Sequence, residues 1–272
     1  MKKHKSNKKR KVTKKNGMIV FRPTDVVSVE STGGAGYGFE RQIQTLFVVL
    51  MICDGDLAFA PGRKITKIQF QVRRKGYNID DARIEMVDAA GNVSQVLVQA
   101  KRTISLTKSC DDFTGTIQAA WLDYRNGLKF NREADKLVLA TGPLRDMDRG
   151  VLDWLLERAR TNDCESLVAE LRSGAGISAD RRKFYEFICE IVRLQNECAR
   201  DEEIVAFLRH LYVFFPDTVY GDGLLASFAI SLVKKHFAVA DADRTFSLNK
   251  AVGIARRVRV GQIQLPYVWA AA

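Results

Sequence analysis

The sequence predicts an α/β protein, with a mixed sheet flanked by helices in its first half and an α-helical domain after it. Three observations lead to this class. Residues 65–73 alternate apolar and polar side chains, which is the pattern of a half-buried strand. Residues 78–101 contain two more strand-like segments around a turn rich in Asp, Ala, Gly and Asn. From Leu152 onward every strong periodic signal is helical.

The first helix is expected over residues 37–53, after a glycine-rich loop at residues 31–38. Apolar residues recur at helical spacing along it and form a core stripe. They are Phe39, Ile43, Leu46, Phe47 and Leu50. Glu40 falls in the first turn of this helix, at the boundary of the core, where the helix dipole favours a negative charge. A short strand is expected before the loop, within residues 19–29.

The glycine-rich loop does not predict an ATP or NAD site. It contains no G-x-x-x-x-G-K-[ST] motif, and no convincing strand precedes it with an acid about 20 residues beyond in a strand–helix–strand unit. The helix N-terminus with its glycines either contacts a phosphate group or forms a tight entry turn, and the sequence leaves both open.

The second helix begins near Asp111 and Asp112, which suit a helix N-terminus. Its apolar face consists of Phe113, Ile117, Trp121 and Tyr124. A buried strand follows at residues 135–140, and this strand, helix, strand order implies a crossover connection and a mixed sheet. Composition then changes, so we place a domain boundary near residues 143–150. Helical stripes follow around residues 154–158, 184–191 and 204–211, with weaker helices at 224–237 and 246–258.

Composition indicates a soluble protein with a basic N-terminal tail. At 272 residues, 46% hydrophobic and 28% charged, the chain is long enough for one large or two modest domains. No apolar run approaches the roughly 18 residues of a membrane span. The net charge of +11 comes mostly from nine Lys and Arg residues within the first 15 positions. We interpret residues 1–17 as a disordered arm that either contacts nucleic acid or acidic surfaces loosely or only aids solubility.

Cysteine and histidine usage excludes several kinds of site. The five cysteines include no C-x-x-C spacing, which is typical of reduced thiols in a cytoplasmic protein. Only three histidines are present, one of them in the basic tail. This scarcity argues against a zinc site or a Ser-His-Asp arrangement.

The two strand-like segments within residues 78–101 predict a candidate metal site. Folded as an antiparallel hairpin about Ala90, they bring Asp81 opposite Gln99. Lys101 then lies on the same face, because side chains repeat every two residues along a strand. A carboxylate and an amide oxygen suit a hard cation such as Mg²⁺, and a nearby lysine stabilises an anionic transition state or positions a water molecule. The alternative is an ordinary amphipathic hairpin that ends in a solvated lysine.

Three short motifs resemble the PD-(D/E)xK nuclease superfamily. They are Gly-Tyr-Gly-Phe-Glu-Arg-Gln at 36–42, Ile-Asp-Asp at 79–81 and Val-Gln-Ala-Lys at 98–101. More narrowly, residues 30–142 look like the dsDNA nuclease domain of CBASS effector nucleases and of STAND-type antiviral ATPases. The resemblance implies a restriction-endonuclease-like core of helix, three-stranded meander, helix and strand.

The resemblance also implies roles for individual residues. Asp81 would be the metal-binding aspartate, with the adjacent Asp80 as the alternative. Gln99 stands where the motif more often has Asp or Glu, as in the QxK branch of the superfamily. Lys101 would be the catalytic lysine, and Glu40 would complete the metal shell. The first proline of the motif is absent from this sequence.

These roles imply a Mg²⁺-dependent endonuclease, with Mn²⁺ as a possible substitute, that cleaves double-stranded DNA as the effector of an antiphage system. Cutting both strands needs two sites, so a homodimer or tetramer is expected. In this view residues 18–148 form the nuclease domain and residues 149–272 form a helical assembly or linker domain. Apolar faces in that second half, around residues 184–191 and 207–215, are expected to meet another copy. No Walker motif occurs in the sequence, so a sensor or NTPase module is either absent or lies outside this chain.

Two other interpretations remain open at this stage. The chain is alternatively a catalytically inactive nucleic-acid-binding module that keeps a nuclease-like fold. It is also conceivable as an oligomerisation adaptor in which the hairpin has a purely structural role.

Overall fold

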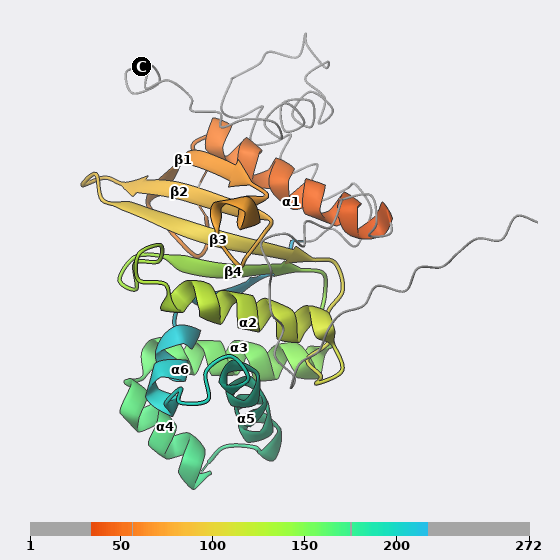
Figure 1. The fold of residues 1–272 in the computed structure, drawn as a ribbon, viewed down its shortest axis with the longest axis vertical. Helices are drawn as coiled ribbons and strands as arrows, with labels where there is room; N and C mark the ends of the chain where they lie inside the picture. The colour runs from red at the N-terminus through yellow and green to blue at the C-terminus, as the bar shows by residue number, and fades with distance from the viewer. Residues whose placement is uncertain (1–33, 56, 175, 217–272) are drawn as a thin grey trace, which may run out of the picture.

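The computed structural model describes residues 34–55, 57–174 and 176–216 (Figure 1). The basic tail, the short strand predicted within residues 19–29 and the two weaker helices predicted after residue 223 lie outside these described residues. Among the helices that the structure describes, none is both long and apolar enough to cross a membrane.

Within the described residues, five strands form one sheet in the order β1-β2-β3-β4-β5. Figure 1 labels the first four of them. The strands β1 (Arg63–Phe70), β2 (Ala82–Asp88) and β3 (Val93–Lys101) form an antiparallel meander. The strand β4 (Lys136–Thr141) runs parallel to β3, and β5 (Leu211–Phe214) runs parallel to β4. The prediction of an α/β protein with a mixed sheet is therefore confirmed.

Helices cover both faces of this sheet (Figure 1). Helix α1 (Gly34–Ile52) lies on one face, and α2 (Asp111–Arg125) lies on the other. Beyond α2 come α3 (Asp146–Thr161), α4 (Cys164–Ser173), α5 (Ala179–Arg193) and α6 (Asp201–Leu208). A short 3-10 helix, η2 (Val72–Lys75), connects β1 to the segment before β2. The predicted order of helix, three-stranded meander, helix and strand is present.

Alternation along β3 sorts its side chains between two cores. Val96 and Val98 pack in the core on the α1 side, whereas Leu97 packs on the α2 side. The predicted α1 stripe is buried at every position: Phe39, Ile43, Leu46, Phe47 and Leu50 are all at most 6% exposed. On the α2 side, Trp121 stacks on Tyr124 and meets Phe207 of α6 edge-on. Helix α2 therefore shares its core with the later helices.

The turn between β2 and β3 fixes the register of the hairpin. Asp88 Oδ1 accepts hydrogen bonds from the backbone N–H groups of Ala90 at 3.0 Å and Asn92 at 2.8 Å. Gly91 adopts a φ of 85°, a left-handed conformation that suits glycine. Val87 then pairs with Val93, and the same register continues to the pair Ala82 and Val98. One position further, Asp81 lies beside Gln99, as predicted.

The structure corrects three local predictions. The glycines from Gly34 onward belong to helix α1 rather than to a loop. Strand β1 ends at Phe70 instead of continuing to residue 73, because Gln71 turns into a left-handed conformation with a φ of 58°. Leu211, predicted at the end of a helix, begins strand β5. The pairing of β5 with β4 shows that the later part of the chain adds a strand to the same sheet, while a domain boundary near residues 143–150 stays a prediction.

The apolar faces that were expected to meet a second copy are largely covered within the chain itself. Phe184, Phe187 and Ile188 of α5 are at most 8% exposed, and Phe207 of α6 is fully buried. Phe184 and Phe187 pack against Phe113 of α2, with ring centroids 6.3 and 6.0 Å away. These faces therefore leave little apolar surface for a second copy to cover, and a homodimer or tetramer stays a prediction without that support.

Trp121→Ala should destabilise the protein by about 3 to 5 kcal/mol, because it empties the junction between α2 and α6. Chemical denaturation would measure the loss. Leu128→Ala is the control, since Leu128 is 100% exposed and its truncation should change stability by less than about 0.5 kcal/mol. Similar losses in the two variants would contradict the packing described for α2 and α6.

Candidate functional site

The predicted site residues meet at the end of the sheet where β2 begins and β3 ends. Residues 80 and 81 reach this end in the segment between η2 and β2, which backbone hydrogen bonds hold. Gln71 N donates to the carbonyl oxygen of Asp81 at 3.0 Å, and Val72 N donates to that of Asp80 at 2.7 Å. The left-handed turn at Gln71 is what allows both bonds, because it reverses the chain after β1. The side chains of the two aspartates then lead to different partners.

Asp81 points toward the end of β3. Its Oδ2 accepts a hydrogen bond from the Ala100 backbone N–H at 2.6 Å and another from Nε2 of Gln99. Gln99 is 8% exposed, and its Oε1 accepts a hydrogen bond from the Asp80 backbone N–H at 3.3 Å. The pair of Asp81 and Gln99 thus links the start of β2 to the end of β3 through both side chains.

Asp80 points toward η2 instead. Its Oδ1 accepts a hydrogen bond from the Arg73 backbone N–H at 3.3 Å, and its Oδ2 lies 3.6 Å from Arg73 Nε. The structure therefore brings the carboxyl group of Asp81, rather than that of Asp80, to the Gln99 side chain. The assignment of Asp81 as the metal ligand stays a prediction, and this geometry favours it over the alternative.

Glu40 approaches the same place from helix α1. Its Oε1 accepts hydrogen bonds from Gln44 Nε2 at 2.8 Å and from Gln71 Nε2 at 3.0 Å. Gln71 thus connects Glu40 to the turn that holds Asp81. The two carboxylates are close enough for the charge of Glu40 to raise the pKa of Asp81.

The pKa of Asp81 is raised from its ordinary value of 3.8 to about 8. Burial is the largest cause, because it removes water from the charged form, and the negative charge of Glu40 is the second. The Ala100 N–H group and the Lys101 ammonium act in the opposite direction. A carboxyl with these surroundings gains from a bound cation, because the cation offsets both the lost water and the repulsion from Glu40.

Lys101 is held by a residue that the sequence analysis did not place in the site. Its Nζ lies 2.9 Å from Oδ1 of Asp112, at the start of α2. The Lys101 side chain is 33% exposed and that of Asp112 is 58% exposed, so water screens this ion pair. In the sequence, Asp112 is recognisable only as a residue suited to a helix N-terminus, and no spacing reveals that α2 starts beside the end of β3.

The donor set is small for a metal ion. Within the described residues, no group of three or more His, Cys, Asp and Glu residues could hold one. A cation here would rest on Asp81 and Glu40, with the amide oxygen of Gln99 as a third ligand. Because Gln99 now offers its Nε2 to Asp81, its amide group would have to turn over to offer the oxygen. The raised pKa of Asp81 is the observation that fits a cation at this place.

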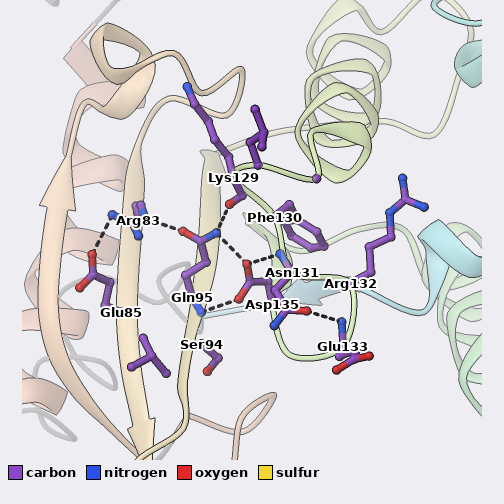
Figure 2. A pocket seen from close by; sticks show the side chains of 13 residues that line it. Arg83, Glu85, Ser94, Gln95, Lys129, Phe130, Asn131, Arg132, Glu133 and Asp135 are labelled. Carbon is purple, nitrogen blue, oxygen red and sulfur yellow. Dashed lines mark hydrogen bonds and ion pairs between the residues drawn. The ribbon is translucent and has the colours of Figure 1, made fainter.

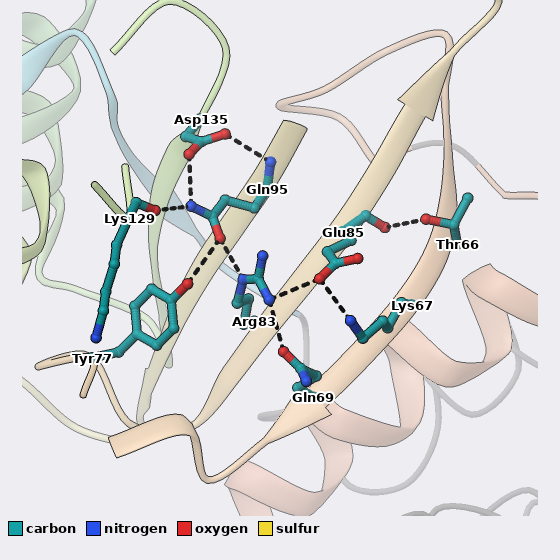
Figure 3. A network of polar contacts seen from close by, with 9 residues as sticks. All are labelled: Thr66, Lys67, Gln69, Tyr77, Arg83, Glu85, Gln95, Lys129 and Asp135. Atoms are coloured by element: carbon teal, nitrogen blue, oxygen red, sulfur yellow. Dashed lines mark hydrogen bonds and ion pairs between the residues drawn. The ribbon is translucent and has the colours of Figure 1, made fainter. Parts of the chain in front are cut away.

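A second polar region lies on the α2 side of the sheet, around Gln95 (Figure 3). Oε1 of Gln95 accepts from the guanidinium of Arg83 and from Tyr77 Oη, the latter at 3.4 Å. Its Nε2 donates to Asp135 at 2.7 Å and to the carbonyl of Lys129. The network ties β2, β3 and the loop before β4 together. Gln95 and Asp135 at its centre are both buried, so we interpret the network as a structural link between these segments.

Two cavities lie outside the Asp81 site. The first, of about 530 Å³, lies beside the Gln95 network and is lined by the loop before β4, including Lys129 and Arg132 (Figure 2). The second, of about 660 Å³, lies between the loop after β3 and the starts of α3 and α5. Basic and aromatic side chains line this second cavity, among them Lys108, Arg181, Lys183, Phe184 and Phe187.

No protein-family description and no curated protein matches this chain. Among solved structures it resembles an Acinetobacter baumannii Cap4 SAVED/CARF-domain containing receptor with the cyclic trinucleotide 2′3′3′-cAAA, at 12% identity and a TM-score of 0.50, over 84% of this chain and 42% of that one. The same receptor with 3′3′3′-cAAA gives 11% identity and a TM-score of 0.49, over 84% and 44%. A Moraxella osloensis Cap4 SAVED/CARF-domain containing receptor gives 13% and 0.48, over 85% and 45%. The chain thus spans less than half the length of these proteins.

These comparisons correct the family and the function predicted from the sequence. The structure matched at a TM-score of 0.50 is a Cap4 SAVED/CARF-domain containing receptor with a cyclic trinucleotide and not a PD-(D/E)xK dsDNA nuclease domain, so that assignment is wrong. The DNA endonuclease activity and the restriction-endonuclease-like fold that depended on it are withdrawn with it. The physical reason is that the resemblance rested on three short motifs, one in the first helix and two on the hairpin. An acidic residue in a first helical turn and an Asp, Gln and Lys on paired strands also suit other α/β frameworks.

The titration of Asp81 should be visible in protein stability. Because its pKa lies above the unfolded value of 3.8, the folded state holds more protons than the unfolded state between about pH 4 and about pH 8. Raising the pH through this window should therefore lower the free energy of unfolding, by at most about 1.4 kcal/mol per pH unit. Asp81→Asn should lose this dependence, as urea unfolding at several pH values would measure. Parallel curves for the two proteins would contradict the raised pKa.

Proposed function

We propose that this chain is a ligand-recognition module of an antiphage-defence protein, and that its ligand is a cyclic oligonucleotide. The ligand class is suggested by the Cap4 receptor with 2′3′3′-cAAA, whose fold this chain resembles at a TM-score of 0.50. The antiphage role agrees with the expectation from the sequence. Since fold alone does not determine function, the proposal depends on what the site offers to such a ligand.

The observation that carries the proposal is the convergence of Asp81, Glu40 and Lys101 at one end of the sheet. A cyclic oligonucleotide is a ring of phosphodiesters, each with one negative charge. Lys101 supplies a partly exposed positive charge beside the carboxylates. The carboxyl of Asp81 in turn gains from a divalent cation. A lysine and a cation placed side by side can bind the negative charge of a phosphodiester and polarise its P–O bonds.

We further propose that the site performs metal-dependent phosphodiester hydrolysis. A Mg²⁺ or Mn²⁺ ion held by Asp81, Glu40 and Gln99 would polarise the phosphate and lower the pKa of a water molecule. Lys101 would stabilise the charge that develops on the phosphate oxygens. It must first leave Asp112, and this costs little because that ion pair is exposed to solvent. Asp112 would then be the counter-ion that holds Lys101 before the ligand arrives.

The test uses the full chain with 3′3′3′-cAAA and 2′3′3′-cAAA, in Mg²⁺, in Mn²⁺ and in EDTA. Binding is measured by calorimetry and the products by mass spectrometry, with plasmid DNA as the comparison substrate. We expect binding of a cyclic trinucleotide and its opening only when metal is present. Binding without opening would reject hydrolysis and retain recognition. Absence of binding would overturn the ligand class, and so would metal-dependent cutting of the plasmid with the trinucleotides left intact.

Lys101→Ala should lower the rate of phosphodiester hydrolysis by about 100-fold or more, since its charge acts mainly in the transition state. The folded structure should survive, because the side chain is partly exposed and its ion pair with Asp112 is solvated. Lys108→Ala is the matched control: it removes an exposed lysine of the loop after β3, which pairs with Glu190 of helix α5, and should leave the rate unchanged. Equal rates for wild type and Lys101→Ala would remove Lys101 from the mechanism.

A further inference from the structure

Asp123 of helix α2 is a buried carboxylate that has no part in the site proposed above. It is 1% exposed, and it faces the segment that leads into strand β2. We propose that Asp123 is a positioning residue of the Asp81 site, which fixes the backbone of Asn78 and Ile79 and thereby sets where Asp81 stands. This inference rests on the proposed function, because it concerns how the metal-binding carboxylate is placed.

The contacts of Asp123 are directed almost entirely at that backbone. Its Oδ1 accepts from the Asn78 backbone N–H at 2.9 Å and from Asn78 Nδ2 at 2.8 Å. Its Oδ2 accepts from the Ile79 backbone N–H at 2.8 Å. Three donors thus converge on one carboxylate, two of them from consecutive peptide groups. The second of these groups belongs to Ile79, two residues before Asp81.

The arrangement suits a carboxylate better than any other side chain of the same shape. An ionised carboxyl only accepts hydrogen bonds, so it serves all three donors at once. An asparagine would turn an N–H₂ group toward at least one N–H donor and leave it unpaired in a buried place, which is costly. Burial raises the pKa of Asp123, and the hydrogen bonds from Ile79 and Asn78 oppose that rise.

The segment from Asn78 to Asp81 is held from two sides. At its start, Asp123 of helix α2 accepts hydrogen bonds from the segment's backbone N–H groups. At its end, Gln71 and Val72 donate backbone hydrogen bonds to the carbonyl groups of Asp81 and Asp80. The Ile79 side chain is 1% exposed and belongs to the core on the α2 side, so the segment cannot rotate freely between these two sets of hydrogen bonds. Loss of the hydrogen bonds to Asp123 should therefore allow the Asp81 carboxyl to move relative to Glu40 and Gln99.

Asp135 provides a matched control for a merely structural role. It is 3% exposed and accepts from the Gln95 backbone N–H at 2.8 Å, from Gln95 Nε2 at 2.7 Å and from the Asn131 backbone N–H at 2.8 Å. It is thus a buried carboxylate with three donors, like Asp123. Its partner Gln95 lies near the start of β3, however, at the other end of that strand from Lys101.

The experiment compares wild type, Asp123→Asn and Asp135→Asn in the full chain. Unfolding by urea gives the stability of each, calorimetry with Mg²⁺ gives metal affinity, and ¹³C NMR of the Asp81 carboxyl gives the pH midpoint of its titration. We expect similar losses of stability in the two variants. Asp123→Asn should weaken Mg²⁺ binding by about tenfold or more and shift the Asp81 midpoint, whereas Asp135→Asn should leave both unchanged.

Metal affinity and Asp81 midpoint both equal to those of Asp135→Asn would overturn the inference. If wild type itself binds no Mg²⁺, the metal site proposed above fails, and the Asp81 midpoint alone decides whether Asp123 positions that carboxyl. If Asp123→Asn does not fold, Asn78→Ala is the milder variant that tests the same contact. It removes only the side-chain hydrogen bond, one of the three donors to Asp123, and should therefore weaken Mg²⁺ binding less than Asp123→Asn does, by about threefold. An unchanged affinity and midpoint in that variant would reject the role of Asp123.

Discussion

The register between β2 and β3 is the constraint on which the candidate site depends. It is set at the far end of the hairpin, where Asp88 binds the backbone of the turn and Gly91 takes a left-handed conformation. A slip of one residue would send each side chain of β3 to the opposite face of the sheet. Gln99 would then leave Asp81, and Leu97 would leave the core beneath α2. The turn residues, remote from the site, therefore determine whether the site exists.

Local patterns predicted those parts of the fold that depend on neighbours in the sequence. The apolar stripe of α1, the hairpin register and the start of α2 near Asp111 follow from spacing, turn chemistry and acidic residues in a first helical turn. The left-handed turn at Gln71 was not predicted, because a positive φ is uncommon for a residue other than glycine and no sequence pattern indicates it. Strand β5 was missed because it is only four residues long and directly follows a helix with similar apolar residues.

The same limit explains which site residues could be predicted. Asp81 and Gln99 meet through strand pairing, which alternation and a turn make visible in the sequence. Asp112 and Asp123 reach the site through the packing of α2 on the sheet. They are far from Asp81 in the sequence, and no periodic pattern of residues connects them to it. The family assignment failed for a related reason: short motifs describe one corner of the molecule, whereas the likeness to the Cap4 receptors extends over 84% of the chain.

The two outermost strands of the described sheet also limit how copies of the chain could meet. Strand β1 interrupts its pairing with β2 between Ile65 and Lys67, which is a β-bulge, and it presents the exposed Lys64. Strand β5, at the other edge, is four residues long. Bulges, lysines and short edge strands all hinder the addition of a further strand from another molecule. The described sheet is thereby protected against edge-to-edge aggregation, and growth by strand addition at β1 would require burying a charge and straightening the bulge.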